Sequence, residues 1–524
     1  MNIFAIFTWL AGRMDAFAFV LYFVAMVAIG VYFFFKSKDV GEKDYFLGGR
    51  AMGPWVTAMS AQASDMSAWL LMGLPGSILA FGFGQAWIGI GLAIGTAANW
   101  ILVAKRLRKF SKASGDAITL PQYLSNRFAS KSHTLSIICA VVFLVCFTIY
   151  VASAFVAGTG VFTTLFPGLP KGLAMSIFAA IVIAYTFLGG FKAVCWTDFF
   201  QGLLMIAALL IVPIVVGLVK DLDPKALETV YNGPNGEEFE FVASFANASW
   251  KDIASGLGWG LGYFGMPHII VRFMAIQKPS MVKKSATVAI IWVVLSLAAT
   301  IVIAYFGRMF LYSDGRDLSK ELLENGNQSL IFVELARDVF PAFIAGLLLA
   351  AIIAASMSTA DSQLLVAASS FTSDLYKPLI RKQASNKEVL WVGRIVVIVI
   401  AIVAYFIARS EGKAAQAIMD LVSNAWGIFG AAFGPAVLLS LFWKRFTYKG
   451  AVAGILVGAI VDMVWLWLPV CNGAALTAVT GIYEIIPGFI LGGIAAIVVT
   501  LIDKKPSQEV LAIYEKATDN SVDD

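Results

Sequence analysis

Long apolar segments dominate the chain, and they restrict it to a small set of architectures. A hydrophobic fraction of 60% with only 14% charged residues excludes a soluble globular protein. A membrane β-barrel would need alternating strands of about ten residues, and the continuous apolar runs exclude that fold as well. Thirteen segments are long and apolar enough to cross a bilayer as helices: 15–34, 53–78, 85–104, 135–164, 172–190, 198–219, 252–275, 285–306, 341–367, 389–408, 418–442, 450–468 and 484–502. The sequence therefore predicts an all-α polytopic membrane protein with about 13 transmembrane helices.

Basic residues fall in alternate loops and so indicate an orientation. Lysines and arginines follow the first, third, seventh, ninth, eleventh and last spans, whereas the net acidic segment 221–250 lies on the other side. By the positive-inside rule, the N-terminus is outside and the C-terminus is cytoplasmic. Residues 1–505 then form one transmembrane domain, and residues 506–524 form a cytoplasmic tail. The net charge of +5 comes from these loops, so it implies no nucleic-acid partner.

Residues for covalent chemistry are scarce. The chain has two histidines, and its four cysteines show no paired spacing, so neither a metal centre nor a disulfide framework is expected. The loops are too short to hold a soluble catalytic domain, and no nucleophile–base set is present. We expect that the protein is not an enzyme and needs no cofactor.

Two of the predicted spans look interrupted. The stretch 61–76 carries Asp65 among small and polar residues, and the stretch 256–267 contains five glycines and a proline. Irregular backbone at membrane depth is tolerated only where it is buried in protein or lines a wet cavity. The two interruptions lie five spans apart, as in transporters built from inverted repeats, with repeats at about 53–219 and 252–442. The alternative is that the glycines only allow close helix packing.

Hydroxyl groups and carbonyls near the first interruption suggest a cation site. Where a helix unwinds beside Asp65, its freed carbonyls can coordinate a hard cation through oxygen. Ala355, Ser358 and Thr359 share one face of the ninth span and could supply the other half of a sodium site. The alternatives are that Asp65 caps the second half-helix and that the serines bond back to their own helix.

An aromatic face on the second interrupted span suggests a substrate wall. Trp259 and Tyr263 are four residues apart, and Pro267 continues the same face. A small amphiphilic molecule could lie against such a surface. Core packing or an interfacial aromatic belt is the alternative.

Four blocks of sequence together resemble the sodium/solute symporter family: 47–50, 64–76, 185–191 and 423–435. The resemblance covers about residues 15 to 505, and the second and fourth blocks are similar to the proline-transporting branch. It implies the leucine-transporter fold, with two inverted five-helix repeats and additional helices.

The resemblance also implies roles for individual residues. The residues implied for the sodium site, through backbone carbonyls or hydroxyls, are Ala63, Met66, Ala355, Ser358 and Thr359. The residues implied for the substrate site are Ser67, Trp69, Tyr150, Trp259, Tyr263 and Pro267. Arg50 would belong to a cytoplasmic gate, and Asp65 would tune sodium affinity and coupling. Asp361 stands where the family has a neutral residue, and with Asp198 and Ser362 it suggests a second cation or proton site.

The function implied is sodium-coupled uptake of L-proline by alternating access in a bacterial plasma membrane. The partners are then sodium, L-proline and the lipid bilayer, and no oligomeric state follows from the sequence. Another small amino acid, or a carboxylate such as pantothenate, is the first alternative. A channel or a membrane sensor is the second.

Overall fold

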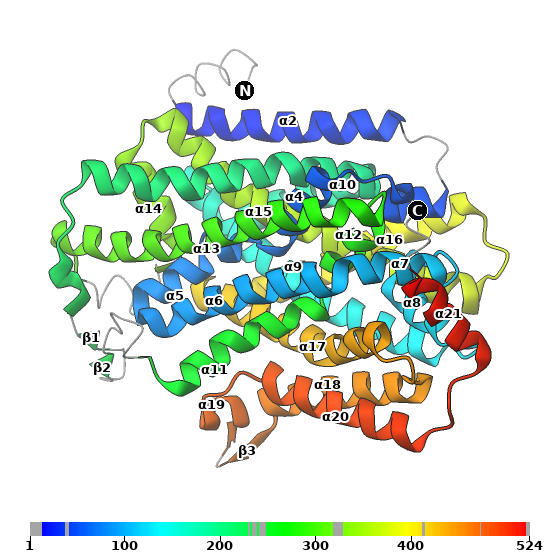
Figure 1. Cartoon of the computed structure of the whole chain (residues 1–524). Helices are drawn as coiled ribbons and strands as arrows, with labels where there is room; N and C mark the ends of the chain where they lie inside the picture. The colour runs from blue at the N-terminus through cyan, green and yellow to red at the C-terminus, as the bar shows by residue number, and fades with distance from the viewer. Residues whose placement is uncertain are drawn as a thin grey trace.

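The fold is almost entirely helical. The computed structural model describes residues 13–36, 41–228, 231–232, 238–239, 248–317, 328–410, 414–471 and 473–519. Figure 1 shows the long helices running side by side along one direction, with α2 at the upper edge and α18 and α20 at the lower edge.

The structure confirms the predicted spans. Within the described ranges, ten helices are long and apolar enough to cross a membrane. They lie in α2 (Met14–Lys36), α6 (Phe83–Ala98), α9 (Thr134–Leu165), the second part of α10 (Lys171–Val219), α13 (Val282–Ser313), α15 (Ala342–Ser370), α16 (Asn386–Ser410), α17 (Ala414–Phe442), α18 (Tyr448–Trp467) and α20 (Ile485–Ile502). The fifth predicted span is the shorter apolar helix Lys171–Phe187, which Gly190 separates from the rest of α10 by its φ of 64°. The second and seventh spans are the two that look interrupted in the sequence.

Both interruptions are real breaks in helices. The second span consists of α4 (Pro54–Asp65), a short 3-10 turn at Ala68–Leu70 and α5 (Gly73–Phe81). The seventh consists of α11 (Trp250–Gly258), a 3-10 segment at Trp259–Phe264 and α12 (Pro267–Ala275). Ser67 has a positive φ of 21°, which ends the regular path of α4. Pro267 occupies the first turn of α12, where its missing N–H costs no hydrogen bond.

The glycines of the seventh span also allow close helix packing. The two interpretations of these glycines, a broken helix and close packing, therefore both hold. A Cβ atom on Gly260 would lie 2.4 Å from the carbonyl oxygen of Gly91 in α6. A Cβ atom on Gly91 would lie 2.1 Å from the carbonyl oxygen of Gly256. The backbones of α6 and the broken span are therefore in direct contact.

Short helices and strands connect the long helices. The short helices are α3 (Glu42–Leu47), α7 (Lys105–Ala113), α8 (Leu120–Arg127), α14 (Ile331–Val339), α19 (Leu476–Thr480) and α21 (Gln508–Thr518). A π-helical segment, Asn99–Ala104, joins α6 to α7. The strands β1 (Tyr231–Asn232) and β2 (Glu238–Phe239) pair antiparallel, as do β3 (Pro469–Cys471) and β4 (Ala474–Ala475).

The predicted tail contains a helix that packs on the transmembrane part. The Tyr514 ring of α21 lies 5.3 Å from the ring of Phe110 in α7, and Lys444 forms an ion pair with Glu515 at 2.6 Å. Figure 1 shows α7, α8 and α21 together at one end of the molecule.

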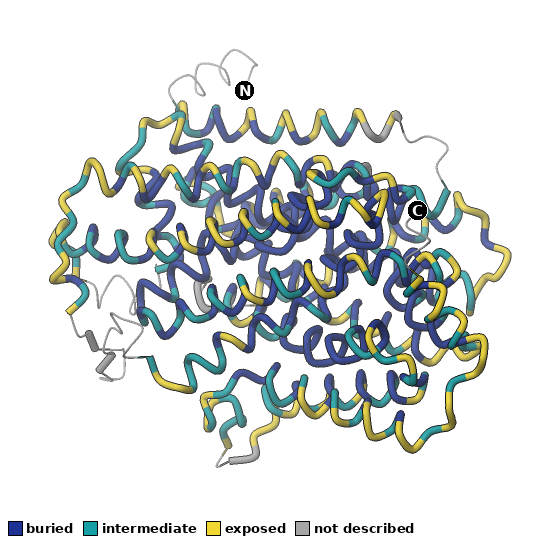
Figure 2. The backbone as a smooth tube through the Cα atoms, viewed as in Figure 1, coloured by how far each residue is buried: buried dark blue, intermediate teal, exposed yellow. Residues whose placement is uncertain are grey.

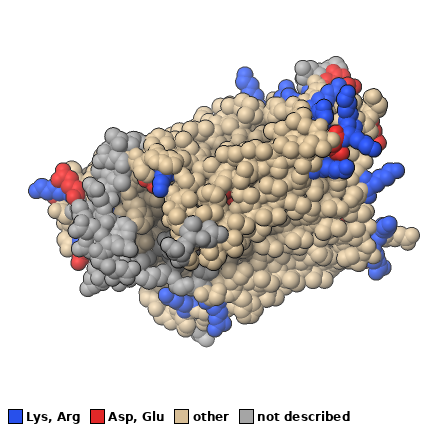
Figure 3. All heavy atoms as spheres, turned by 90° about the horizontal axis from the view of Figure 1, so that it is seen from below, with Lys and Arg blue, Asp and Glu red and all other residues tan. Residues whose placement is uncertain are grey.

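Burial and charge follow the pattern of a membrane protein. On the face shown in Figure 3, charged side chains gather at the two ends and leave a largely uncharged belt between them. Large apolar side chains such as Val24, Ile395 and Phe406 are exposed on the outer helices. Soluble proteins rarely expose contiguous apolar surface on this scale. The central helices α15 and α17 are mostly buried, whereas only a minor part of α16 and α20 is buried (Figure 2).

Candidate functional site

The first helix break lies against α15. In a continuous helix the amide of Ser67 would donate to the carbonyl of Ala63. Instead, the Ser67 amide donates to the Thr359 hydroxyl at 3.1 Å, and the Ser358 hydroxyl donates to the Ala63 carbonyl at 2.8 Å. Ser358 and Thr359 are both buried. The break therefore frees backbone groups of α4, and α15 provides their partners.

The other two oxygens predicted for the cation site, the carbonyls of Ala355 and Met66, make local hydrogen bonds. The Ser358 hydroxyl is 3.2 Å from the Ala355 carbonyl of its own helix, so the alternative of back-bonding also applies. The Met66 carbonyl accepts a hydrogen bond from the Leu70 amide at 3.3 Å. Carbonyl and hydroxyl oxygens of this kind suit a hard cation such as sodium. Within the described ranges, no group of three or more His, Cys, Asp or Glu side chains could hold a metal ion.

Asp65 joins the two broken helices. The Tyr263 hydroxyl donates to the Asp65 carboxylate at an oxygen–oxygen distance of 2.5 Å, and both residues are buried. The alternative role of Asp65 as the cap of the second half-helix is wrong, because α5 begins after Met72 without a side-chain cap hydrogen bond. The Ser67 hydroxyl accepts a hydrogen bond from the Trp69 amide at 3.1 Å and caps the 3-10 turn that precedes α5.

The predicted aromatic wall is built from both breaks. The indoles of Trp69 and Trp259 stack with ring centroids 5.6 Å apart. Each of these rings is at most 5% exposed. The two interruptions of the sequence therefore meet through side chains as well as through Asp65.

Tyr150 reaches the same region from α9. Its ring lies 6.3 Å from the ring of His268, the residue that follows Pro267 at the start of α12. Tyr150 and Pro267 are buried. Both predicted substrate residues thus lie at the start of α12, which follows the second break.

Two aromatic residues of this cluster were missed by the sequence reasoning. The Trp426 ring of α17 lies 5.1 Å from Tyr263, and its indole N–H donates to the Trp259 carbonyl at 2.8 Å. The Tyr483 ring stacks on Trp259 at 5.1 Å. Trp426 lies inside the resembling block 423–435, which could have indicated it. Tyr483 lies in the turn before α20, and no local pattern distinguishes it.

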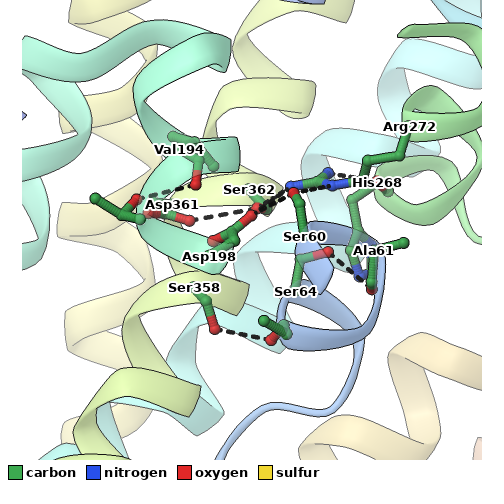
Figure 4. Close-up of polar contacts among 12 residues, drawn as sticks. Ser60, Ala61, Ser64, Val194, Asp198, His268, Arg272, Ser358, Asp361 and Ser362 are labelled. Carbon is green, nitrogen blue, oxygen red and sulfur yellow. Dashed lines mark hydrogen bonds and ion pairs between the residues drawn. The ribbon is translucent and has the colours of Figure 1, made fainter. Parts of the chain in front are cut away.

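A buried charged network lies beside the hydroxyl site (Figure 4). The Arg272 guanidinium of α12 forms an ion pair with Asp198 at 3.1 Å and donates to Ser60 at 3.1 Å and to Ser362. Ser60 also donates to Asp198 at 2.7 Å, and Ser362 donates to Asp361 at 3.3 Å. All five side chains are buried. The structure therefore brings Asp198 and Asp361, predicted as a pair, into one network.

The sequence reasoning overlooked Arg272, the cation at the centre of this network. The signal was available, because an arginine inside an apolar span is costly and marks a functional position. Ser60 precedes Ala63 by about one helical turn in α4, and Ser362 follows Ser358 by about one turn in α15. The charged network is therefore the next layer of the α4–α15 contact.

Arg50 holds together the end of the molecule that carries α21. Its guanidinium forms an ion pair with Asp116 at 2.8 Å and donates to Ser111 at 3.1 Å and to the Met274 carbonyl. Lys43 also pairs with Asp116. Arg50 thus links the segment after α7 to the last turn of α12.

Burial and neighbouring charges at this end shift two pKa values. Burial lowers the pKa of the Arg50 guanidinium, although Asp116 opposes that effect. Burial alone would raise the pKa of the Asp116 carboxyl, but the hydrogen bond from Lys43 and the charges of Arg50 and Lys43 hold it below its usual range. Asp116 is therefore a carboxylate at neutral pH.

Sequence comparisons identify relatives of this chain. The model of the sodium:solute symporter family matches residues 45–458. The sodium/proline symporter of Escherichia coli (strain K12) is 44% identical over 502 residues, covering 95% of each chain. The osmoregulated proline transporter OpuE of Bacillus subtilis (strain 168) is 41% identical over 495 residues, covering 94% of this chain and 96% of the relative.

Structure comparisons confirm the predicted leucine-transporter-type fold. A substrate-bound, outward-open Na⁺-coupled sialic acid symporter superimposes with a TM-score of 0.71 at 21% identity, covering 94% of this chain and 99% of that structure. The nucleobase-cation-symport-1 transporter Mhp1, in a closed conformation, superimposes with a TM-score of 0.53 at 13% identity, covering 90% and 98%.

Proposed function

The chain belongs to the sodium:solute symporter family, and from that premise we propose that it couples sodium entry to the uptake of L-proline. The contact between the break in α4–α5 and the hydroxyls of Ser358 and Thr359 is the observation that carries the proposal. The names of the relatives at 40–44% identity, which are sodium/proline symporters or proline transporters, support proline as the substrate.

Sodium binds, in this proposal, between the broken helix and α15. The ligands are the carbonyls of Ala63, Met66 and Ala355 and the hydroxyls of Ser358 and Thr359. Two hydrogen bonds across the contact support the assignment: the Ser358 hydroxyl donates to the Ala63 carbonyl, and the Ser67 amide donates to the Thr359 hydroxyl. A bound cation takes the place of these hydrogen bonds when each hydroxyl turns an oxygen lone pair toward the ion. Sodium then holds the broken helix against α15 in the geometry that accepts substrate.

L-proline binds between the two breaks. Its apolar pyrrolidine ring packs on the aromatic wall, and its carboxylate accepts hydrogen bonds from backbone amides at the break, as anionic groups do at half-helix N-termini. The residues proposed to contact it are Ser67, Trp69, Tyr150, Trp259, Tyr263 and Pro267. The stacked indoles and the burial of the site support an amphiphilic ligand of this size.

Asp65 and the charged network have coupling roles. The Tyr263–Asp65 hydrogen bond ties the substrate wall to the helix that holds sodium, so Asp65 tunes the affinity for both ligands. In the network, the Arg272 guanidinium pairs with Asp198 and reaches Asp361 only through the Ser362 hydroxyl, which supports a second cation or a proton at Asp198 and Asp361. We assign that role as part of the proposal.

The proposed orientation places the Arg50 cluster and α21 in the cytoplasm. Arg50 then closes the cytoplasmic side of the site when its contacts to Asp116 and Met274 are formed. The two inverted repeats extend over about 53–219 and 252–442, and alternating access moves one bundle against the other. The N-terminus is outside, and the plasma membrane is the location.

The proposal is tested in proteoliposomes. Uptake of labelled L-proline is measured with and without an inward sodium gradient, and the expected result is saturable uptake that the gradient stimulates. Uptake that is the same with and without the sodium gradient contradicts the proposed coupling to sodium. Competition by unlabelled amino acids and by pantothenate tests the substrate, and stronger competition by any of these than by proline contradicts proline as the substrate. Uptake that does not saturate would indicate a channel.

A further inference from the structure

Two buried carboxyl groups lie outside the proposed transport site, where α17, α18 and α20 pack together. Asp462 belongs to α18, and Glu484 directly precedes α20. Asp462 is 0% exposed and Glu484 is 2% exposed. An ionisable residue inside a membrane span is costly and marks a functional position. The proposed transport cycle uses neither of these residues.

Neither carboxyl group pairs with a basic side chain in the described part of the chain. Both carboxylate oxygens of Asp462 are buried without a hydrogen-bond partner among the described residues. Glu484 accepts a hydrogen bond from the hydroxyl of Thr477 in α19 at 3.2 Å, and that donor carries no charge. A buried anion without a counter-charge costs on the order of several kcal/mol. The pair therefore requires a bound cation or protons.

Protons alone do not satisfy Asp462. A protonated carboxyl group has an O–H donor, and a buried donor also requires a partner. Because neither oxygen of Asp462 has a partner among the described residues, protonation removes the charge but leaves the polar atoms unsatisfied. A metal cation compensates the charge and binds the oxygens at the same time.

A glycine of α17 leaves space for a ligand beside the two carboxyl groups. A Cβ atom on Gly427 would lie 3.0 and 3.4 Å from the two carboxylate oxygens of Asp462 and 3.4 Å from the Cγ atom of Glu484. Both acidic side chains therefore border the position that a side chain at residue 427 would occupy. One ligand at this place can contact Asp462 and Glu484 together.

We propose that Asp462 and Glu484 bind a divalent metal cation of the calcium type. Ca²⁺ binds about six to eight oxygen ligands and accepts carboxylates in monodentate or bidentate geometry. Two carboxylates carry two negative charges, which a divalent cation balances and a sodium ion does not. Mg²⁺ requires near-ideal octahedral geometry and loses its water reluctantly, so it suits a buried pair less well. The Thr477 hydroxyl and water complete the ligand set.

The pair is connected to the aromatic wall through neighbouring residues. Tyr483, which precedes Glu484, stacks on Trp259 with ring centroids 5.1 Å apart. Trp426, which precedes Gly427, donates its indole N–H to the Trp259 carbonyl at 2.8 Å. A cation that joins α18 to the start of α20 beside α17 therefore stabilises the position of Trp259 through both neighbours.

The position of the pair indicates the side from which the cation enters. Figure 1 shows α19, which supplies Thr477, and α21 at opposite ends of the α18–α20 pair. On the proposed orientation the α19 end faces the outside, so the cation comes from the external medium. The site does not depend on which solute the protein transports.

The test measures metal binding by the purified full chain in a neutral detergent, without sodium or proline. Tb³⁺ replaces Ca²⁺ at oxygen sites, and nearby tyrosine and tryptophan rings sensitise its luminescence; Tyr483 is adjacent to Glu484 in the chain. We expect saturable luminescence that Ca²⁺ displaces at about 1 mM or below, with Mg²⁺ and Na⁺ each requiring at least about tenfold more. Luminescence that does not saturate, or displacement by Mg²⁺ or Na⁺ as readily as by Ca²⁺, overturns the proposal.

Matched variants locate the binding. Asp462→Asn and Glu484→Gln each remove one carboxylate at nearly constant volume, and each is expected to weaken Ca²⁺ binding about tenfold or more, since even the outer partners of metal ligands contribute this much. Asp374→Asn is the control, because Asp374 is also a buried carboxylate but accepts its hydrogen bond from Thr119. The control is expected to change binding less than twofold, and equal weakening in all three variants overturns the proposal.

A second measurement keeps the test valid if the variants do not fold. Ca²⁺ should raise the thermal unfolding temperature of the parent protein more than Mg²⁺ does, because a ligand that binds the folded state stabilises it. Equal effects of the two ions contradict a calcium-type site. Since no sodium or proline is present, a failure here is distinguishable from a failure of the proposed transport.

Discussion

The Tyr263 hydroxyl donates to the Asp65 carboxylate across 2.5 Å, and this bond joins the two helix breaks on which the proposed site is built. A hydrogen bond to a buried carboxylate contributes about 1.5–3 kcal/mol. Tyr263→Phe removes the donor and keeps the ring, so we expect the sodium concentration for half-maximal uptake to rise about tenfold or more. Tyr483→Phe is the control, because the Tyr483 hydroxyl donates to the neutral carbonyl of Ser423. Equal effects of the two substitutions would contradict the special role of Asp65.

The hydroxyls of Ser358 and Thr359 on α15 should determine the affinity for sodium rather than the folding of the protein. Ser358→Ala and Thr359→Ala each remove one proposed ligand, and each should raise the half-maximal sodium concentration more than it lowers the amount of protein in the membrane. Ser356→Ala is the matched control, since Ser356 is buried and bonds only to the Ile352 carbonyl of its own helix among the described contacts. A loss of expression without a change in sodium dependence would make Ser358 and Thr359 structural.

The network around Arg272 should add a second cation to the transport cycle. Uptake measured against sodium concentration is then expected to give a Hill coefficient above one in the parent and close to one in Asp361→Asn. Asp374→Asn is the control. Asp374 is also a buried carboxylate, but it lies outside this network and accepts its hydrogen bond from the Thr119 hydroxyl. A coefficient of one in both the parent and Asp361→Asn would contradict a second sodium site.

The Arg50–Asp116 pair should act independently of pH over the physiological range. The carboxyl pKa of Asp116 lies below its ordinary value of 3.8, so the stabilisation is present above that value and is lost only as pH falls through the lower folded-state pKa. The Asp116 side chain is 40% exposed, so Asp116→Asn should reduce uptake by about fivefold at most. The ratio of variant to parent uptake should stay constant from pH 5 to 8. A ratio that approaches one near pH 6 would show that Asp116 titrates there.

The contact between Gly260 and Gly91 should not accept a methyl group. A Cβ atom on Gly260 would approach the Gly91 carbonyl oxygen to 2.4 Å, and relief of such overpacking costs about 1–3 kcal/mol. Gly260→Ala should therefore lower the thermal unfolding temperature of the purified protein. Gly168→Ala is the control, because a Cβ atom there meets no atom within 4 Å. Unchanged unfolding temperatures in both variants would show that the two backbones separate at little cost.

The sequence predicted those features that depend on local pattern. Apolar length identified the spans, and glycine, proline and a charged residue at membrane depth identified both breaks. Helical spacing placed Ser358 and Thr359 on one face, and that face meets the first break in the structure.

Features that depend on distant contacts could not be predicted in the same way. Tyr483 stacks on Trp259, which lies more than 200 residues earlier in the chain, and nothing near either residue encodes the pairing. Arg272 was visible as a charge in an apolar span, but its partners come from three other helices. The packing of α21 on α7 likewise depends on the whole fold, so the sequence alone predicted only a tail after residue 505.

The stack of Trp69 on Trp259 has a spectroscopic consequence. One indole belongs to each broken helix, and their centroids are 5.6 Å apart. Two chromophores at this separation couple electronically, and the coupling falls steeply as they move apart or rotate. The near-ultraviolet circular dichroism of the unlabelled protein therefore contains a contribution that changes with the distance between the two breaks, beside those of the other tryptophans among the 14 in the chain.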